Sequence, residues 1–559
     1  MSDPAESPRE VDPLKGREVD GAANGTADSA RKKSGCGGKL SLSRLSGWRT
    51  AAFLFSLFLC LTIVFAFSFI LPCPVRPQYV VAWNRTIPAA AAYNFLAVED
   101  TNNDKVKDVI IIYKSREGSQ NNTCEHEGLP SPCLLLLVVD GTDGETIWER
   151  PLASDLTCAK CGLEGLDEQN KGCLLVHDTN ITAINIYSGV QLWQHQLSSD
   201  GKVVAPILSV PDMDGDGQKD FVLLMSDHTQ MKLKFHSGKT GKAIGEVVEL
   251  ASEVTSHHLM HTTANGAQYL LMQTDTGMIT QGLWSLAQKA NISTKLKMDP
   301  EWEKMRNGFL CVQRVFEVSG GKSVPSLLLI GPSEQLHHCT NEVPSMELLR
   351  GDSLTSMWKI NTSKLLSEPS FGHFNQDHIP DVVIEEDAGN NTKKVMILDG
   401  NSGGLLWNVS LLTKAHTPWP SSVLTLYSYS VFMMWGEKQS QTNDTNEFVE
   451  ERFSYLLHPL HSNLLLERSN PVEDVIAFKA TLLERGRHAS YLILNGPSAN
   501  EGVDPDLAKS VVLTKRKLKK DIDDSNVLRV GEPQEEPVSK DNEDYIKEAF
   551  NRLRFSDSL

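Results

Sequence analysis

Closely spaced carboxylates are the residues of this chain whose types and spacing best suit chemistry. Residues 212–220 carry aspartates at positions 1, 3, 5 and 9 of a nine-residue loop, and an apolar run follows directly. Four acids this close repel one another, and a hard cation that takes roughly six to eight oxygen ligands relieves the repulsion. The segment predicts a calcium loop leading into a β-strand, with ligands from Asp212, Asp214, Asp216, Asp220 and the Gln218 carbonyl.

Two further segments repeat this loop imperfectly. Residues 100–108 keep oxygen ligands at the same four positions, which are Asp100, Asn102, Asp104 and Asp108. Residues 373–381 have His373 in place of the first carboxylate and keep the other three, Asn375, Asp377 and Asp381. An apolar run follows each copy, so all three segments are expected to open a strand.

Two alternatives compete with a calcium loop. An EF-hand needs Glu at loop position 12, and Leu223 stands there, so an EF-hand is excluded. An Asx-rich turn between strands forms without any metal, because Asp, Asn and Gly favour such turns by themselves. This second alternative stays open for all three copies.

A second recurring unit positions these loops. The segments 140–148, 187–193 and 399–407 each combine a Gly-bearing turn with a strand that closes on Trp, and 236–244 and 350–358 are weaker copies. They predict β-hairpins, whose glycines supply the tight turn. We interpret the tryptophan as a packing wedge between neighbouring sheets, since its large ring buries much apolar surface.

The spacing of these units predicts the fold class. The first acidic loop precedes the second by 112 residues, and the second precedes the third by 161, which are two and three units of about 54–56 residues. Repeats of this length built from short strands are typical of a β-propeller. We therefore expect an all-β ectodomain over residues 93–514, with about seven blades and with eight also possible.

An acidic loop of the form D-x-D-G-D-G-x-x-D that opens a strand, as at 212–220, is similar to the FG-GAP repeat of integrin-alpha propellers. Most of the chain, roughly Ser41 to Leu559, resembles a small group of single-pass membrane proteins that share integrin-alpha-like repeats. The resemblance implies a propeller with calcium loops on its blade hairpins, used for recognition rather than catalysis. The chain departs from integrins in its degenerate third loop, and no inserted ligand-binding domain is evident.

One segment has the composition of a membrane anchor. Residues 50–71 contain no charge, and at about 1.5 Å per residue a helix of this length spans a ~30 Å hydrocarbon core. Six basic residues precede it within residues 31–49, so the positive-inside rule places the N-terminus in the cytosol. We expect a type II signal anchor, a disordered cytosolic tail at 1–49 and a stalk at 72–92, with the C-terminal part extracellular or lumenal. The run begins too late and is too long for a cleaved signal peptide.

Glycosylation and disulfides are expected beyond the anchor. The sequons there are Asn84, Asn121, Asn180, Asn291, Asn361, Asn390, Asn408 and Asn443. The disulfide candidates are Cys73, Cys124, Cys133, Cys158, Cys161, Cys173, Cys311 and Cys339. Proximity favours Cys124–Cys133 and Cys311–Cys339, while zinc or redox chemistry at Cys158-Ala-Lys-Cys161 would need a fourth ligand or a strand–helix context that is not evident.

Charge limits the class of partner. Residues 1–49 hold nine basic and seven acidic residues, whereas the rest holds 45 basic and 64 acidic ones, a net charge of −19. So acidic an ectodomain is unsuited to nucleic acid and suits divalent cations or basic partners. The extension at 515–559 begins with a charged segment, 515–520, interpreted as a solvated edge strand, and ends in a short amphipathic helix within 541–555.

Catalytic motifs are scarce. The sequence has no Walker loop and no His-Glu-x-x-His, and His257 and His258 would point to opposite faces of a strand rather than share a metal with His261. We therefore expect a non-catalytic, calcium-stabilised protein-binding, adhesion or scaffolding module. The alternatives are an accessory subunit or chaperone of another membrane protein, and an ectoenzyme of the quinoprotein type.

Overall fold

The computed structural model describes residues 47–70 and 81–557 apart from short segments, and it divides into two compact units, Met1–Arg76 and Pro77–Leu559. The segments left out of the second range are 117–122, 130–131, 153–154, 167–170, 198–200, 228–229, 251–253, 275–276, 305–308, 320–324, 332–342, 415–416, 442–447, 485, 501–509 and 532–538.

The described part of the first unit is a single helix, α1 (Gly47–Ile70). It contains most of the apolar run predicted to cross a membrane, and large side chains such as Phe53 and Phe58 are exposed on it. Among the residues that the structure describes, no helix meets the length and apolarity that a membrane crossing requires. The signal anchor at 50–71 stays a prediction, and the tail up to residue 46 and segment 71–80 lie outside the described residues.

The second unit consists mainly of antiparallel meanders of four strands. The first two are β2 (Ala90–Glu99), β3 (Asp108–Ser115), β4 (Leu134–Val139), β5 (Thr146–Pro151), and β6 (Leu156–Leu163), β7 (Gly172–His177), β8 (Asn180–Asn185), β9 (Gln191–Gln196). The next two are β10 (Lys202–Val210), β11 (Asp220–Ser226), β12 (Met231–His236), β13 (Ala243–Leu250), and β14 (Val254–Thr262), β15 (Gln268–Thr274), β16 (Gly277–Gly282), β17 (Phe309–Leu310). The fifth is β18 (Arg314–Val318), β19 (Ser326–Gly331), β20 (Ser345–Leu349), β21 (Ser356–Asn361).

The sixth sheet is larger than the others. It has nine strands and runs β22-β23-β24-β25-β27-β28-β29-β33, with β26 paired to β27. Its strands are β22 (Ser370–Gly372), β23 (Asp381–Gly389), β24 (Thr392–Leu398), β25 (Leu405–Leu412), β26 (Ser421–Leu424), β27 (Ser430–Gln441), β28 (Phe448–Leu457), β29 (Leu464–Ser469) and β33 (Asn526–Arg529). A single pairing, Leu412 with Glu437, joins its two halves.

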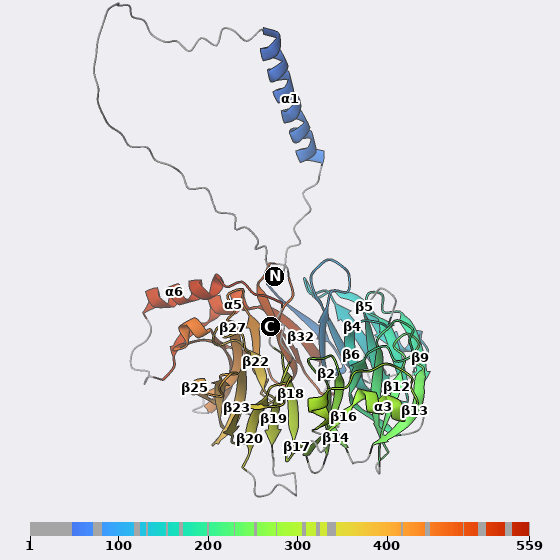
Figure 1. Ribbon diagram of the computed structural model, residues 1–559. Coiled ribbons are helices and arrows are strands. Elements are labelled where there is room, and N and C mark those ends of the chain that lie inside the picture. Colours follow the sequence, from blue (N-terminus) through green and yellow to red (C-terminus); the bar gives the residue numbers. More distant parts are fainter. Residues whose placement is uncertain are drawn as a thin grey trace, which may run out of the picture. The chain divides into compact units, whose positions relative to one another are not determined.

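The first strands of the meanders lie around a common axis. β2 contacts β6, β6 contacts β10, β10 contacts β14, and β14 contacts β18; β22 contacts β26, β26 contacts β30 (Val475–Leu482), and β30 returns to β2. In Figure 1 the sheets of this unit accordingly follow one another in sequence order, from blue through green to orange. This closed succession of antiparallel sheets is a β-propeller.

The ring closes with a strand from each end of the unit. The last sheet has the order β1 (Ala82–Ile87), β32 (Val511–Lys517), β31 (Ala489–Asn495), β30, so β1 pairs with β32. The expected stalk at 72–92 therefore contains a propeller strand, and the expected propeller limits of 93 and 514 are both too narrow. The physical reason is that an unclosed sheet would leave a row of unpaired backbone groups at its edge.

The middle strands of each sheet are buried on both faces. In β3, Val109 and Ile111 pack with the last sheet, whereas Ile110 and Ile112 pack with the sheet that begins at β6. Successive side chains of a strand point to opposite faces, so one apolar run serves two cores. This explains why these strands read as continuous apolar runs rather than as alternating ones.

Tryptophans join neighbouring sheets, as the sequence predicted. The Trp148 indole in β5 donates a hydrogen bond to the Ile186 carbonyl in the β8–β9 turn of the next sheet at 3.1 Å. A Cβ on Gly189 of that turn, where φ is +67°, would lie 2.8 Å from the Trp148 ring. Equivalent bonds of 2.9–3.3 Å run from Trp83, Trp193, Trp302 and Trp358 to the next sheet's turn. Trp407 donates at 2.7 Å to the Ser462 carbonyl between β28 and β29, in the other half of its own nine-stranded sheet.

The C-terminal segment packs on the propeller. The amphipathic helix is α6 (Lys540–Asn551), and its buried residues Ile546 and Phe550 join a core that includes residues of β27, β31 and α5 (Leu518–Asp524). Phe555 then forms a bridge with Thr425. The predicted helix is confirmed, and Tyr545 on its outer side is 68% exposed.

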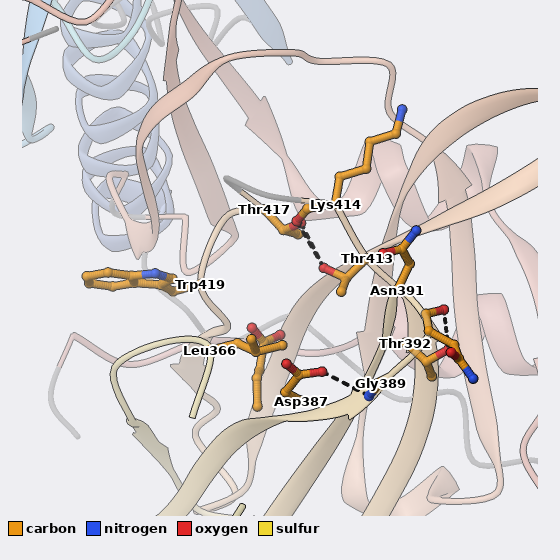
Figure 2. A pocket seen from close by; sticks show the side chains of 11 residues that line it. Leu366, Asp387, Gly389, Asn391, Thr392, Thr413, Lys414, Thr417 and Trp419 are labelled. Carbon is orange, nitrogen blue, oxygen red and sulfur yellow. Dashed lines mark hydrogen bonds between the residues drawn. The ribbon is translucent and has the colours of Figure 1, made fainter. Parts of the chain in front are cut away.

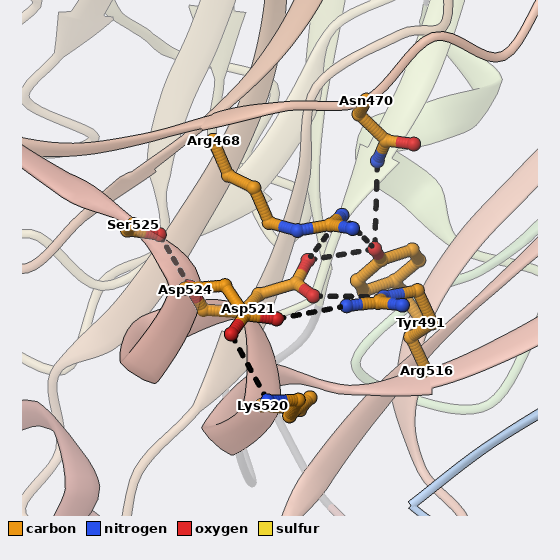
Figure 3. Close-up of polar contacts among 8 residues, drawn as sticks. All are labelled: Arg468, Asn470, Tyr491, Arg516, Lys520, Asp521, Asp524 and Ser525. Atoms are coloured by element: carbon orange, nitrogen blue, oxygen red, sulfur yellow. Dashed lines mark hydrogen bonds and ion pairs between the residues drawn. The ribbon is translucent and has the colours of Figure 1, made fainter.

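The interpretation of residues 515–520 as a solvated edge strand is wrong. β32 lies between β31 and β1, and the Lys515 side chain is fully buried, with its Nζ 2.8 Å from Glu484. Figure 3 shows the next buried group, where Asp521 accepts from Tyr491 at 2.6 Å and pairs with Arg516 at 2.9 Å and Arg468 at 3.4 Å. Closure of the ring by β1 removes the edge that the lysines were expected to protect.

Four short elements complete the described second unit. They are α2 (Thr123–His126), which carries Cys124, and α3 (Leu283–Lys289) and α4 (Pro300–Glu303), which lie between β16 and β17, together with the 3₁₀ turn η1 (Pro459–His461) between β28 and β29. Trp302 of α4 supplies the inter-sheet wedge that a strand supplies in other sheets.

Candidate functional site

The Asp212 loop joins β10 to β11 and brings three of its predicted ligands together. Carboxylate oxygens of Asp212, Asp214 and Asp216 all lie within 4.8 Å of one another, and this is the single group of its kind among the described residues. Asp214 is exposed and the other two are half-buried. The first, third and fifth positions of the loop thus converge as the sequence predicts.

The backbone of this loop wraps the carboxylates. Gly215 and Gly217 have φ of +81° and +87°, a conformation that glycine adopts at little cost. The amides of Gly215 and Gly217 donate to Asp212 at 2.6 and 2.8 Å. Partial burial works to raise the pKa of Asp212, but these amide hydrogen bonds outweigh it and hold that pKa below its usual value.

The ninth aspartate has a different position. Asp220 is buried at the start of β11, where its two oxygens accept from the amides of Met213 at 2.6 Å and Gly238 at 2.9 Å. It therefore ties the first hairpin of its sheet to the third one. Burial raises its pKa to about 6 although both amides oppose that shift. A ligand role for Asp220 stays a prediction, as does one for the Gln218 carbonyl.

In the other two loops, the aspartate at position nine accepts the same pair of backbone hydrogen bonds. Asp108 accepts from the amides of Thr101 at 2.8 Å and Gly141 at 3.1 Å, and burial raises its pKa to about 6. Asp381 accepts from Phe374 at 2.6 Å and Gly400 at 3.0 Å, again with a pKa raised by burial to about 6. The first and third turns of a meander lie at the same end of the sheet, so in these three sheets one aspartate reaches both turns.

The Asp100 loop has the same backbone with fewer converging acids. Asn103 and Lys105 hold the left-handed positions, with φ of +62° and +71°, where the Asp212 loop has glycine. Asn102 donates to Asp104 at 3.3 Å and to Asp140 of the neighbouring turn at 3.4 Å. One buried oxygen of Asp100 accepts no hydrogen bond from the described residues. The Asn102 side-chain amide thus separates the carboxylates of Asp104 and Asp140.

The third loop, between β22 and β23, retains its turn but not a carboxylate cluster. Asn375 donates to Asp399 at 3.3 Å and accepts from the amide of Asp377, also at 3.3 Å. His373, at the position of the missing carboxylate, is buried, and burial lowers its pKa. These contacts are those of an Asx-rich turn, in agreement with the degeneracy of the sequence.

Calcium fits the Asp212 loop better than the other two. Three converging carboxylates supply hard oxygen ligands, and each oxygen that already accepts an amide retains a second lone pair. Asp212, Asp214 and Asp216 would hold the ion, which when bound would offset their mutual repulsion. The amide hydrogen bonds by themselves stabilise the conformation of this loop, so an Asx-rich turn also accounts for its shape.

The predicted cysteines fall into three groups. Disulfides join Cys124 to Cys133, as predicted, and Cys161 to Cys173, and Cys311 is also disulfide-bonded. The expectation of a disulfide at Cys158 is wrong, because this buried cysteine has a free thiol whose pKa burial raises to about 12. Cys73 and Cys339 lie outside the described residues.

Six of the predicted sequons lie in the described part of the chain. Asn180 is half-buried, whereas the others are exposed: Asn84, Asn291, Asn361, Asn390 and Asn408. Asn121 and Asn443 lie outside the described residues. Exposure makes glycosylation sterically feasible at five positions, and their modification stays a prediction.

The histidines do not converge on a metal. The Nε2 atoms of His257 and His258 lie 2.8 Å from the Val315 carbonyl and 2.9 Å from the Pro206 carbonyl, while His261 Nδ1 lies 2.7 Å from Glu317. The partners of His257 and His261 lie on β18 of the next sheet, whereas the partner of His258 lies on β10 of the preceding sheet. The side chains therefore serve inter-sheet contacts, as the sequence argument against a shared ion expected.

One serine motif escaped the sequence analysis. Residues 400–404 read Gly-Asn-Ser-Gly-Gly and match the spacing Gly-x-Ser-x-Gly of serine hydrolases. That motif works on a turn between a strand and a helix, whereas residues 400–404 connect strands β24 and β25. The Ser402 hydroxyl donates to Asp399 within this turn, so its contact is that of a turn residue.

Comparison with known proteins agrees with the fold. A family model described as the FAM234A/B beta-propeller matches residues 83–556. The chain belongs to this family. The matched range begins in β1 and ends beyond α6, so the FAM234A/B propeller includes the closing strand and the C-terminal segment.

Individual relatives span almost the whole chain. Human protein FAM234A is 33% identical over 564 residues, which cover 99% of each protein, and mouse protein FAM234B is 28% identical over 535 residues, 91% of this chain and 83% of that protein. The WD40 domain of SCAP from fission yeast is 11% identical with a TM-score of 0.42, and the match covers 78% of this chain and 98% of that one. The finer resemblance to FG-GAP repeats stays a prediction.

Proposed function

We propose that this FAM234A/B-family propeller is a non-catalytic, membrane-anchored module for protein binding, adhesion or scaffolding. The observation that carries the proposal is a group of exposed apolar side chains around the C-terminal segment. We call it the C-terminal patch and define it as Leu426, Tyr427, Leu460 and Tyr545, which are 45%, 67%, 63% and 68% exposed. Exposed apolar groups that gather in one region favour a protein partner.

Each residue of the C-terminal patch lies on the C-terminal segment or on a segment that contacts it. The Leu426 amide donates to the Arg554 carbonyl at 2.9 Å. Leu460 belongs to η1, whose neighbours His458 and His461 pack against Phe550 of α6, the helix that also carries Tyr545. Tyrosine is among the residues enriched at protein interfaces and at their hot spots, and the C-terminal patch contains two tyrosines.

Crosslinking in membranes tests the proposal. The full chain should crosslink stoichiometrically to a protein partner, and the double variant Tyr427→Ser, Leu460→Ser should lose that product. Val190→Ser is the matched control, because Val190 is 55% exposed on the β8–β9 turn, outside the C-terminal patch. No stoichiometric partner, or equal loss in the control, would contradict the proposal.

Calcium in the Asp212 loop belongs to the same proposal as a structural ion. The convergence of Asp212, Asp214 and Asp216 supports it, and the Asp100 loop is the second candidate. The ion would stabilise the loop between β10 and β11, so its contribution would be to folding rather than to chemistry. The FG-GAP resemblance agrees with this assignment.

Placement in the membrane is also part of the proposal. The uncharged run at 50–71 and the basic residues before it support a type II anchor, with the propeller extracellular or lumenal. The two disulfides with both partners described and the five exposed sequons agree with an oxidising compartment.

The number of blades is a further part of the proposal. We count the nine-stranded sheet as two blades because a single pairing joins its halves, which gives eight blades.

Two alternatives have separate readouts. An accessory subunit or chaperone of another membrane protein would also use the C-terminal patch, and its crosslinked partner would itself be a membrane protein. A quinoprotein-type ectoenzyme would show cofactor absorbance in the purified protein. Neither alternative requires calcium in the Asp212 loop to be structural.

A further inference from the structure

A polar cavity of about 510 Å³ opens at the end of β23 opposite the His373 loop. Its wall includes the β23–β24 turn and the segment that leaves β25. Figure 2 shows the Trp419 ring on one side and Asn391 and Thr392 on the other, with Thr413 and Thr417 between them. Trp419 is 48% exposed, so the cavity has an aromatic wall open to solvent.

The cavity contains a glycosylation sequon in its own wall. Asn390, Asn391 and Thr392 all line it, and they form an N-x-T sequon on the turn. Asn390 is exposed, and the turn is held by the Gly389 amide, which donates to Asp387 Oδ1 at 2.9 Å. A sugar on Asn390 would therefore start at the cavity rather than at a free surface.

The lining suits a carbohydrate. The hydroxyls of Thr413 and Thr417 lie 3.0 Å apart, and Thr417 also donates to the Lys414 carbonyl at 2.7 Å. Because these contacts use the hydroxyl hydrogens, the two threonines and Asp387 offer acceptors to sugar hydroxyls, either directly or through water. The indole of Trp419 offers a flat apolar surface for the C–H face of a pyranose ring.

We propose that the N-linked glycan of Asn390 folds back into this cavity and packs its first sugars against Trp419. The inference rests on the proposed extracellular or lumenal placement of the propeller, because glycan transfer occurs in that compartment. A tethered sugar is a better occupant than a free one. Covalent attachment to the wall gives it an effective concentration of about millimolar or more, so weak stacking suffices to keep it bound.

Site-resolved deglycosylation of the full chain tests this inference. The purified native protein is treated with a peptide N-glycosidase, and release at each sequon is followed by mass spectrometry. Asn408 is the matched control, because it is exposed on β25 of the same sheet and does not line the cavity. We expect release at Asn390 to be about tenfold slower than at Asn408, and equal after denaturation.

Two variants test whether the Trp419 indole causes the slow glycan release at Asn390. Trp419→Ala should raise the release rate at Asn390 to that at Asn408 and leave Asn408 unchanged, whereas Trp419→Phe should retain most of the protection. If Trp419→Ala fails to fold, the comparison of native with denatured wild-type protein still decides the matter.

The remaining outcomes separate this inference from the proposed placement. A glycan at Asn390 that is released as fast as the one at Asn408 overturns the inference. A bare Asn390 in a protein glycosylated at Asn408 also overturns it and leaves the placement intact. No glycan at any sequon overturns both.

Discussion

Two strongly charged segments of this propeller, 212–220 and 515–524, have opposite environments. In the first, Asp214 is exposed and shares its cluster with two further carboxylates. In the second, Asp521 is 2% exposed and is satisfied by Arg468, Arg516 and Tyr491. Both segments are strongly charged in sequence. They differ in whether the protein itself supplies the counter-charge.

The difference shows where this protein has capacity for a cation. A buried carboxylate must be paired with cations or hydrogen-bond donors inside the protein, because leaving it unpaired costs several kcal/mol. Converging carboxylates at the surface are hydrated and can exchange water for a metal ion. The stability of the first segment should therefore depend on the metal ions in solution. The stability of the second should depend on its buried charged residues and fall when one of them is replaced.

The largest effect is expected at the buried segment. Asp521→Ala should lower the free energy of unfolding by about 3–5 kcal/mol, because it removes the buried carboxylate that accepts from the Tyr491 hydroxyl and pairs with Arg468 and Arg516. Asp523→Ala should cost less than about 1 kcal/mol, since Asp523 is exposed and makes one hydrogen bond, to Asn551. Denaturant unfolding measures both, and equal costs would remove the distinction between the segments.

A second buried pair tests whether counter-charge is the cause. Lys393 lies 2.6 Å from Glu385, and both side chains are at most 3% exposed. Lys393→Met should cost about 3 kcal/mol, whereas the double variant Lys393→Met, Glu385→Leu should recover most of that loss, because no charge is then left buried. Absence of recovery in a double-mutant cycle would assign the loss to packing instead.

Calcium should act on the exposed segment. A folded-state ligand present at a hundredfold excess over its Kd stabilises the protein by about 2.7 kcal/mol. We expect such a calcium-dependent rise in melting temperature, and its loss in Asp214→Asn. Asp143→Asn is the matched control, since Asp143 is exposed and accepts a similar turn amide at 2.9 Å. A flat response to calcium and to chelator would leave the loop an ordinary Asx-rich turn.

The smallest effect concerns pH at a buried uncharged group. Burial lowers the pKa of His258 to about 4, while its unfolded value is about 6.5. The neutral side chain therefore contributes stability above pH 6.5, which is lost as pH falls toward 4. We expect His258→Gln to reduce that acid-induced loss by about 2 kcal/mol, and exposed His126→Gln to leave it unchanged. Unfolding curves at pH 7 and pH 4.5 give the comparison.

Local patterns predicted the hairpins and most of their wedges. The Gly-bearing turns and the tryptophans at 148, 193, 358 and 407 could be found because both lie within one short segment. Trp302 could not, since a helix rather than a strand presents it to the next sheet. Trp83 was missed because its strand pairs with residues more than 400 positions away.

The candidate site was predicted in part. Asp212, Asp214 and Asp216 converge because alternate positions of one loop share a side. The buried positions of Asp108, Asp220 and Asp381 depend on a second hairpin that reaches back to them, although an Asp directly before an apolar run was a usable signal. The cavity beside Asn390 is lined by segments that are separate in sequence, the β23–β24 turn and the segment after β25. No local pattern could therefore predict it.

By itself, the sequence determined the class of fold, the positions of its hairpins and the one loop where three carboxylates meet. These features depend on residue spacing within a strand or a turn, where backbone geometry transmits the pattern directly. The tertiary structure alone decided that β1 closes the ring and that Lys515 and Asp521 are buried. Burial depends on which distant strand covers a residue, and no local spacing records that.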